Sequence, residues 1–268
     1  MLKTIQRKIN RQIVNQDAAR KQLLQEGKLN ALKDTYSKGF DITNANTNKY
    51  WNNIFQNEGN LSKQSPMTKD KIASIASFIP EKRLHIIDLG IGQGFLEEVL
   101  QKRQIKYDIE GLDISEISIQ RAKKKFTGKF RVGNVLEASK FYKKETADLI
   151  VAIELLEHIN PSSLFGFYNT IWNILKQNGR LIVSIPINEG LELMNNNPSA
   201  HVRDYSIDLL TAELQLNNFK IEKQITLYAF NDFYNVKKLA SKIFTNHWKP
   251  NSLIIVAKKV EKKKSRQK

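Results

Sequence analysis

The amino-acid sequence predicts an α/β fold, a doubly wound parallel sheet with helices on both faces. Two observations predict it. From Leu84 onward, apolar and β-branched runs alternate regularly with helix-like segments. The first of these runs leads into a turn that carries glycines at alternate positions, "IIDLGIGQG". Strands that alternate with helices pair in parallel, because each helix returns the chain across one face of the sheet.

Five apolar runs are the expected parallel strands, and they read "LHIIDLG", "YDIEGLD", "KFRVGN", "ADLIVAIE" and "RLIVSIP". The segments between them are expected as helices at Phe95–Arg103, Ser115–Phe126, Leu136–Phe141 and Ser162–Leu175. Ser115 is a favourable N-cap, and Pro161 suits the first turn of a helix. Asn178 and Gly179 are expected to stop the last of these helices.

The end of the sequence departs from this alternation. After an expected helix at Ile207–Leu216, the strand-like runs "FKIEKQITLYAF" and "SLIIVAKKV" flank a helical insert at Asp232–Ile243. Two late strands this close in the chain predict an antiparallel hairpin that completes the sheet.

The N-terminal part precedes the alternating region. Apolar residues recur at three- and four-residue steps over residues 2–38, which predicts a helical stretch with stops at Gly27 and Gly39. The polar run "DITNANTN" follows it as a connector. We therefore expect a helical arm and connector over residues 1–66, the main domain over 67–260, and a basic tail over 261–268.

Charge and composition restrict the function classes. The formal net charge is +16, and the two ends carry most of it: residues 1–40 contain nine Lys/Arg against three acids, and residues 258–268 contain seven against one. Such ends can attract RNA phosphates, anionic lipid or acidic partners. There is no cysteine, hence no disulfide and no thiolate chemistry. The start of the chain lacks the apolar core of a secretory signal, and no run is long enough to cross a bilayer, so a cytoplasmic protein is expected.

The glycine turn at Gly90, Gly92 and Gly94 is preceded by an acid, Asp88. A turn between a strand and a helix in a doubly wound sheet is where phosphates and cofactors bind. A phosphate-binding P-loop needs a lysine directly after its last glycine, and none follows Gly94. A dinucleotide fingerprint has its third glycine one position later. Both alternatives are therefore disfavoured.

The segment "IIDLGIGQG" resembles motif I of the class I S-adenosylmethionine-dependent methyltransferases, and further segments resemble this family in order. "IEGLD" resembles the strand that ends in its ribose-binding acid, "GNV" its adenine-flanking turn, "ADLIVAIELLEHI" its fourth strand and catalytic edge, and "LKQNGRLIVSIP" its fifth strand. The resemblance covers about residues 70–260. It implies a seven-stranded Rossmann-like sheet whose last strand is antiparallel, and S-adenosylmethionine as the methyl donor.

The resemblance also implies which residues hold the donor: Asp88, Gly90, Gly92, Gly94, Asp113, Ile114, Asn134, Val135 and Glu154. A strand-end carboxylate such as Asp113 can accept hydrogen bonds from two ribose hydroxyls. The adenine-flanking position usually holds aspartate in this family, whereas this chain has Asn134. Its amide can still meet the adenine edge, and the alternative is that it serves only the turn.

The methyl acceptor is expected beyond the fourth strand, at Glu154, Glu157 and His158. The N/D-P-P-Y/F pattern of adenine and amide-nitrogen methyltransferases is absent there. The trio resembles the E-x-x-E-H with which ubiquinone-biosynthesis O-methyltransferases hold Mg²⁺, and a similar trio with a later histidine in small-RNA 3′-terminal 2′-O-methyltransferases. A divalent metal at these three residues is one interpretation. The other is metal-free, with His158 and Glu157 as catalytic residues or Glu157 as a helix cap.

Two other segments are candidates for contact with the substrate. "HVRDYS" resembles the segment after the fifth strand in relatives that act on quinone, lipid or sugar hydroxyls. Its Arg203 can pair with a substrate anion, or with Asp204 or Asp208 of its own loop, and His201 is a candidate fourth metal ligand. Tyr50 and Trp51 lie where the family's N-terminal segment often covers the cofactor, as a lid or as packing.

We therefore expect an S-adenosylmethionine-dependent methyltransferase that acts on a hydroxyl of a small molecule, a lipid, a quinone or a glycan. The alternatives are metal-assisted methylation of an RNA ribose 2′-hydroxyl, for which the basic ends would supply contacts, and a non-catalytic scaffold. The N-terminal arm is also a candidate surface for a homodimer.

Overall fold

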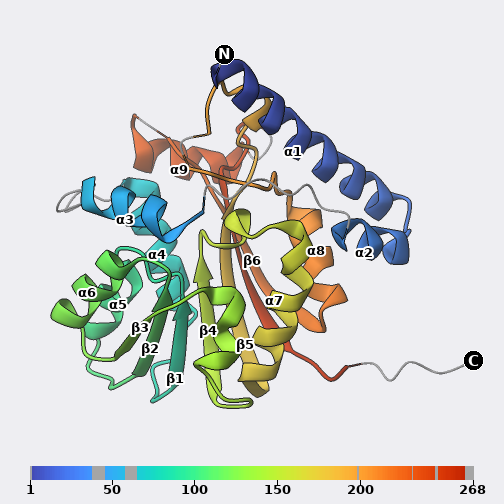
Figure 1. Ribbon diagram of the computed structural model, residues 1–268. Helices are drawn as coiled ribbons and strands as arrows, with labels where there is room; N and C mark the ends of the chain where they lie inside the picture. Colours follow the sequence, from blue (N-terminus) through green and yellow to red (C-terminus); the bar gives the residue numbers. More distant parts are fainter. Residues whose placement is uncertain are drawn as a thin grey trace, which may run out of the picture.

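A computed structural model describes residues 2–37, 46–57, 65–197, 199–230, 232–244 and 247–262. Its centre is a seven-stranded sheet in the order β3-β2-β1-β4-β5-β7-β6 (Figure 1). The strands are β1 His85–Leu89, β2 Asp108–Asp113, β3 Lys129–Val132, β4 Ala147–Ile153, β5 Leu175–Pro186, β6 Phe219–Leu227 and β7 Ser252–Lys259.

The strand directions confirm the predicted fold class. β3, β2, β1, β4 and β5 are parallel, and β7 lies antiparallel between β5 and β6. The chain proceeds outward from β1 through β2 to β3 and then returns to the other side of β1 with β4. This reversal creates a crevice at the carboxyl ends of β1 and β4, where doubly wound sheets bind their ligands.

Helices cover both faces of the sheet. Successive residues of β1 show this, because Ile86 packs into one apolar core and Ile87 into the other, and neither side chain is exposed. The covering helices are α4 Pro66–Ser77, α5 Phe95–Gln101, α6 Glu116–Lys125, α7 Pro161–Ile174 and α8 Ile207–Leu216, and α9 Tyr234–Ile243 lies in the β6–β7 connection. Short 3₁₀ turns form at η1 Val135–Lys140, η2 Leu156–His158 and η3 Leu191–Leu193.

Side-chain caps explain several helix starts. The Ser115 hydroxyl accepts from the Ser118 amide at 3.2 Å at the start of α6, as predicted. Asn160 caps α7, with Pro161 as its first residue. The expected end of α7 is wrong by one residue: β5 already begins at Leu175, and Asn178, with φ +64°, lies inside β5 where its register with β4 shifts. A turn that reads as a helix stop is thus part of an irregular strand.

The N-terminal part contains four helices within the described ranges: α1 Leu2–Gln25, α2 Leu29–Ser37, α3 Asn48–Asn57 and α4. α1 and α2 separate at Gly27, which has φ +69°, as expected for a glycine stop. Gly39 lies outside the described residues. α4 was not predicted, although Ser65 as its cap and Pro66 as its first residue are local signals for it. The division at residues 66 and 260 stays a prediction, and residues 263–268 of the tail are not described.

α1 is fastened to the loop between β5 and α8 by buried polar contacts. Asp17 of α1 accepts from Arg203 Nε at 3.2 Å, and Arg203 Nη2 donates to Glu213 Oε1 of α8 at 2.7 Å. Their side chains are at most 1% exposed. Asn10 of α1 donates to two backbone carbonyls of the same loop. This helix therefore fixes the loop that carries His201. In the described ranges, none of the helices combines the length and apolarity needed to cross a membrane.

Candidate active site

A cavity of about 810 Å³ opens at the carboxyl edge of the sheet, a size typical of cofactor and small-molecule sites. Nine predicted site residues line it: Trp51, Gly90, Gly92, Asp113, Ile114, Asn134, Val135, Glu154 and His158. The cavity therefore joins the glycine turn after β1, the end of β2 and the segment after β4. The other predicted residues, which are Tyr50, Asp88, Gly94, Glu157, His201 and Arg203, are not part of its lining.

Asp113 is fixed at one end of this cavity by backbone donors. Its Oδ2 accepts from the Gly92 amide at 2.9 Å, and its Oδ1 accepts from the Ser115 amide at 2.8 Å. Burial raises the pKa of Asp113, whereas these backbone hydrogen bonds oppose that rise. An ionised carboxylate has about four lone-pair positions, so each oxygen keeps room for one more donor.

The glycine turn leaves open space beside Asp113. A Cβ on Gly92, whose φ is +53°, would meet no heavy atom closer than 3.8 Å. The positive φ, rather than crowding, therefore requires glycine here. Gly94 differs, since its Cβ would lie 2.3 Å from the Phe126 ring. Gly94 thus serves the packing of α5 against α6 rather than the cavity.

Asp88 lies beneath the turn beside Glu97, and both side chains are buried. Burial and the neighbouring Glu97 charge raise the pKa of Asp88, and burial raises the pKa of Glu97 to about 7. Asp88 is thus placed to support the turn from within the protein. Asn134 has a local role as well, because its Oδ1 accepts from the Leu136 amide at 2.9 Å. Its amide group remains as a donor at the cavity.

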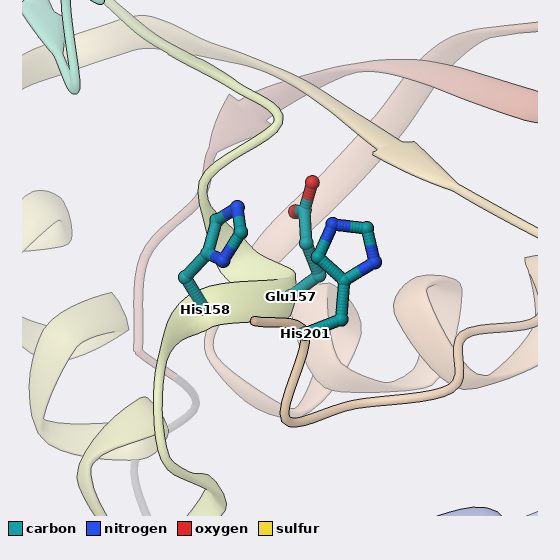
Figure 2. Close-up of side chains that lie close together, drawn as sticks. All are labelled: Glu157, His158 and His201. Carbon is teal, nitrogen blue, oxygen red and sulfur yellow. The ribbon is translucent and has the colours of Figure 1, made fainter. Parts of the chain in front are cut away.

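Glu157, His158 and His201 converge at the other end of the site. Their ligand atoms all lie within 4.8 Å of one another, and Figure 2 shows the three side chains pointing toward a common centre. Glu157 and His158 belong to η2, and His201 comes from the loop held by α1. Both Glu157 carboxylate oxygens and His158 Nδ1 are buried without a hydrogen-bond partner among the described residues.

The electrostatics of this cluster follow from burial. Burial, reinforced by the Glu154 charge, raises the pKa of Glu157 well above its usual range. Burial, reinforced by the charge of His201, lowers the pKa of His158 to about 3. His158 is therefore a neutral imidazole at physiological pH. A carboxylate beside an uncharged imidazole and a second histidine is a donor set that suits a divalent metal.

Two neighbours outside the cluster orient its members. His201 Nδ1 lies 2.8 Å from Glu189 Oε1. Because a carboxylate oxygen accepts, Nδ1 is the donor of this contact, and Nε2 is the ring nitrogen that does not take part in it. The ring of Trp51 meets the ring of His158 edge-on at 4.9 Å, and the Tyr50 ring meets that of Trp51 at 5.2 Å.

The cluster differs from the predicted trio at one position. Glu154 lines the cavity but is held elsewhere: its Oε2 lies 2.9 Å from Lys71 Nζ, and its Oε1 accepts from the Ser184 hydroxyl at 2.9 Å. His201 completes the cluster in its place. Lys71 and Glu189 are site residues that the sequence analysis did not identify. No local signal marks them, because they approach the site from α4 and from the loop after β5.

The proposed contact between Arg203 and the substrate is not supported by the geometry. Its side chain is fully buried, and its partners are Asp17 and Glu213 rather than Asp204 or Asp208. A guanidinium that is enclosed between two carboxylates presents no face to the cavity. Arg203 therefore fixes the His201 loop.

Comparisons with known proteins show similarity in fold. Residues 86–179 match the family model described as a methyltransferase domain. No curated protein matches the chain. A solved S-adenosylmethionine-dependent methyltransferase from Archaeoglobus fulgidus is 18% identical, with 77% of this chain and 99% of that chain covered and a TM-score of 0.60.

Two further solved structures are similar in fold. The magnesium protoporphyrin IX methyltransferase of Synechocystis, solved with bound S-adenosylhomocysteine, is 16% identical, covers 80% of this chain and 98% of its own, and has a TM-score of 0.59. A chain from the complex of the Haloferax volcanii Trm112 activator with a methyltransferase is 14% identical, with 81% and 98% covered and a TM-score of 0.61.

Proposed function

We propose that this chain methylates a hydroxyl group of a small molecule, lipid, quinone or glycan. The proposal starts from the premise that the chain carries a methyltransferase domain of the S-adenosylmethionine-dependent class I type. One observation carries the proposal. A single cavity is lined by the glycine turn and Asp113, at the ends of β1 and β2, and by His158, which follows β4 on the other side of β1. A donor held by the first group would thus face an acceptor held at the second.

The residues of the donor end suit S-adenosylmethionine. The Asp113 carboxylate can accept hydrogen bonds from two ribose hydroxyls. The space beside Gly92 allows a ligand to lie in close contact with the backbone. The Asn134 amide can donate to the adenine edge, with Ile114 and Val135 beside it in the lining. These residues fix the position of the donor, and position is the main requirement of an in-line displacement.

When bound, S-adenosylmethionine would supply an electrophilic methyl carbon for transfer from sulfur to the acceptor oxygen, with S-adenosylhomocysteine as the second product. The acceptor oxygen must also lose its proton. His158 faces the cavity with an uncharged ring, so it can accept a hydrogen bond from the hydroxyl. The Glu157 carboxylate behind it is a stronger base than an ordinary glutamate, because its pKa is raised. The pair can therefore take the proton.

The cluster also fits a divalent metal. A buried carboxylate with no partner is costly, and a cation would satisfy it. Glu157, His158 and His201 would hold that cation, with Glu189 orienting His201 from behind. A metal there would lower the pKa of the acceptor hydroxyl.

Metal titration distinguishes the cluster of Glu157, His158 and His201 from the trio of Glu154, Glu157 and His158 that the sequence predicts. We expect Mn²⁺ to bind the wild-type protein, and Glu157→Gln to abolish the binding measured by calorimetry or electron paramagnetic resonance. Glu154→Gln is the matched control and should retain it, because Glu154 is paired with Lys71. Glu189→Gln should weaken it about 10- to 100-fold. Loss of binding in Glu154→Gln as well as in Glu157→Gln would favour the trio.

A second candidate function is methylation of an RNA terminal ribose. The position of His201 favours it, because a later histidine beside the Glu157–His158 pair is the arrangement that resembles the small-RNA enzymes. A tritiated-methyl transfer screen discriminates between the two functions. We expect label in extracted lipids or small molecules, whereas label in RNA that is retained after periodate oxidation would support the second, because a 2′-O-methylated terminal ribose has no diol left to oxidise.

Replacing Asp113 by alanine is expected to weaken S-adenosylmethionine binding by about 1.5–3 kcal/mol, because hydrogen bonds to a charged group are lost. Asp108→Ala is the matched control, since Asp108 is an exposed aspartate at the start of the same strand. Calorimetry measures both. A similar loss of affinity in Asp108→Ala would mean that the effect of Asp113 is not local.

A further inference from the structure

α9 presents an apolar face to solvent. Phe233, Val236, Leu239, Ile243 and Phe244 are between 62% and 78% exposed. Val236, Leu239 and Ile243 are three and four residues apart, which places them along one side of the helix, and Phe233 and Phe244 lie at its two ends. Isolated apolar side chains are ordinary on a protein surface, whereas three bulky ones on one short helix, with a phenylalanine at each of its ends, form a patch that indicates an interaction site.

The opposite side of α9 is attached to the protein. The Tyr234 hydroxyl donates to Asp70 Oδ2 of α4 at 2.7 Å, and Lys238 forms an ion pair with the same carboxylate. Ser241 is buried. The helix is therefore held in one orientation, and its apolar side points outward.

The apolar face is bordered by positive charge. Lys237 and Lys242 lie on α9, and Lys249 follows in the same connection between β6 and β7. Lys242 and Lys249 are exposed, and none of the three is in an ion pair within the described residues. Among the described residues between 232 and 250, the one acid is Asp232.

The topology places α9 on the side of the cavity. β6 and β5 are both antiparallel to β7, so β6 runs in the same direction as β5 and ends at the carboxyl edge of the sheet. α9 follows β6 and lies above that edge, at the same end as α3 (Figure 1). α3 carries Trp51, which lines the cavity.

We propose that α9 docks on the surface of a membrane that contains anionic lipid. Bulky apolar residues on one side of a helix, with lysines at the border, are the features of helices that lie in the plane of the interface. The lysines add attraction to anionic headgroups. A second copy of this chain fits the face less well, because a two-fold contact would bring lysines against lysines.

This proposal rests on α9 and not on the identity of the acceptor. It does deepen the proposed function for a lipid or quinone acceptor, which such docking would place beside the cavity. Binding to vesicles needs neither S-adenosylmethionine nor acceptor, so failure to bind vesicles and failure to transfer methyl groups are separate results.

The test is co-sedimentation with phosphatidylcholine vesicles, with and without phosphatidylglycerol. We expect the wild-type protein to pellet with the anionic vesicles. Leu239→Glu/Ile243→Glu should lower the partition coefficient by at least about tenfold, because it places charges where apolar side chains enter the interface. Replacing Lys237, Lys242 and Lys249 by glutamine should weaken binding to anionic vesicles about fivefold per lysine.

Leu29→Glu is the matched control, since Leu29 is an exposed leucine of α2. It should bind vesicles like the wild type, and circular dichroism should show all variants folded. Failure of the wild type to pellet with anionic vesicles overturns the proposal, and so does equal binding by Leu239→Glu/Ile243→Glu. A wild-type dimer by sedimentation equilibrium that this variant dissociates, without vesicle binding, would assign the face to self-association instead.

Discussion

Replacing Arg203 by methionine is expected to lower the free energy of unfolding by about 3–5 kcal/mol, because the change leaves the buried Glu213 carboxylate without its cation, whereas Asp17 keeps its ion pair with Arg20. Arg203 lies between Asp17 and Glu213, and all three side chains are at most 1% exposed. The Tyr36, Tyr168 and Tyr205 hydroxyls also donate to Glu213, and all three tyrosines are buried, so the described partners of Glu213 give it no access to water. Urea denaturation measures the effect.

The matched control is Arg180→Met. Arg180 pairs with Glu222 at 2.6 Å across the sheet surface, with side chains 43% and 27% exposed. An exposed pair of this kind contributes at most about 1 kcal/mol. Equal destabilisation by the two changes would contradict the assignment of Arg203 to a buried network that ties α1 to the His201 loop.

Replacing His158 by alanine is expected to lower kcat by at least about 100-fold, the scale of a lost acid–base group, while the affinity for S-adenosylmethionine stays within about twofold. His158 faces the cavity at the acceptor end, with Glu157 and His201 behind it. The measurement is methyl transfer to the acceptor that the labelled screen identifies, at saturating donor.

His247→Ala is the control for His158→Ala, because His247 is exposed in the loop after α9. It should keep wild-type turnover. Unchanged kcat in His158→Ala would remove His158 from the reaction. A large loss of donor affinity in this variant would move His158 to the donor end of the cavity.

Local features of the site could be predicted from the sequence. The glycine turn, Asp88 and the N-cap Ser115 depend on contiguous residues, so strand, turn and helix can be identified together. The alternation of apolar runs predicted the parallel part of the sheet, and the two late runs predicted its antiparallel end. Both predictions are confirmed because the spacing of apolar residues and the order of the apolar runs can be read directly from the sequence.

Features that depend on distant partners could not be predicted. Glu154 has φ +49°, and its side chain is held by Lys71, which comes from an unpredicted helix. Arg203 donates a hydrogen bond to Asp17 on α1, 186 residues away in the sequence, although acids nearer in the chain were the expected partners. The insert at α9 was predicted as a helix, but the exposure of its apolar face depends on what the rest of the fold leaves uncovered.

The central claim is that Asp113 and the glycine turn hold the donor whereas His158 serves the acceptor. Calorimetric titration of S-adenosylmethionine into the wild type, Asp113→Ala and His158→Ala tests it most directly. We predict one binding site in the wild type, unchanged affinity in His158→Ala, and an affinity about 10- to 150-fold lower in Asp113→Ala. Absence of binding to the wild type, or equal loss in the two variants, would contradict the claim.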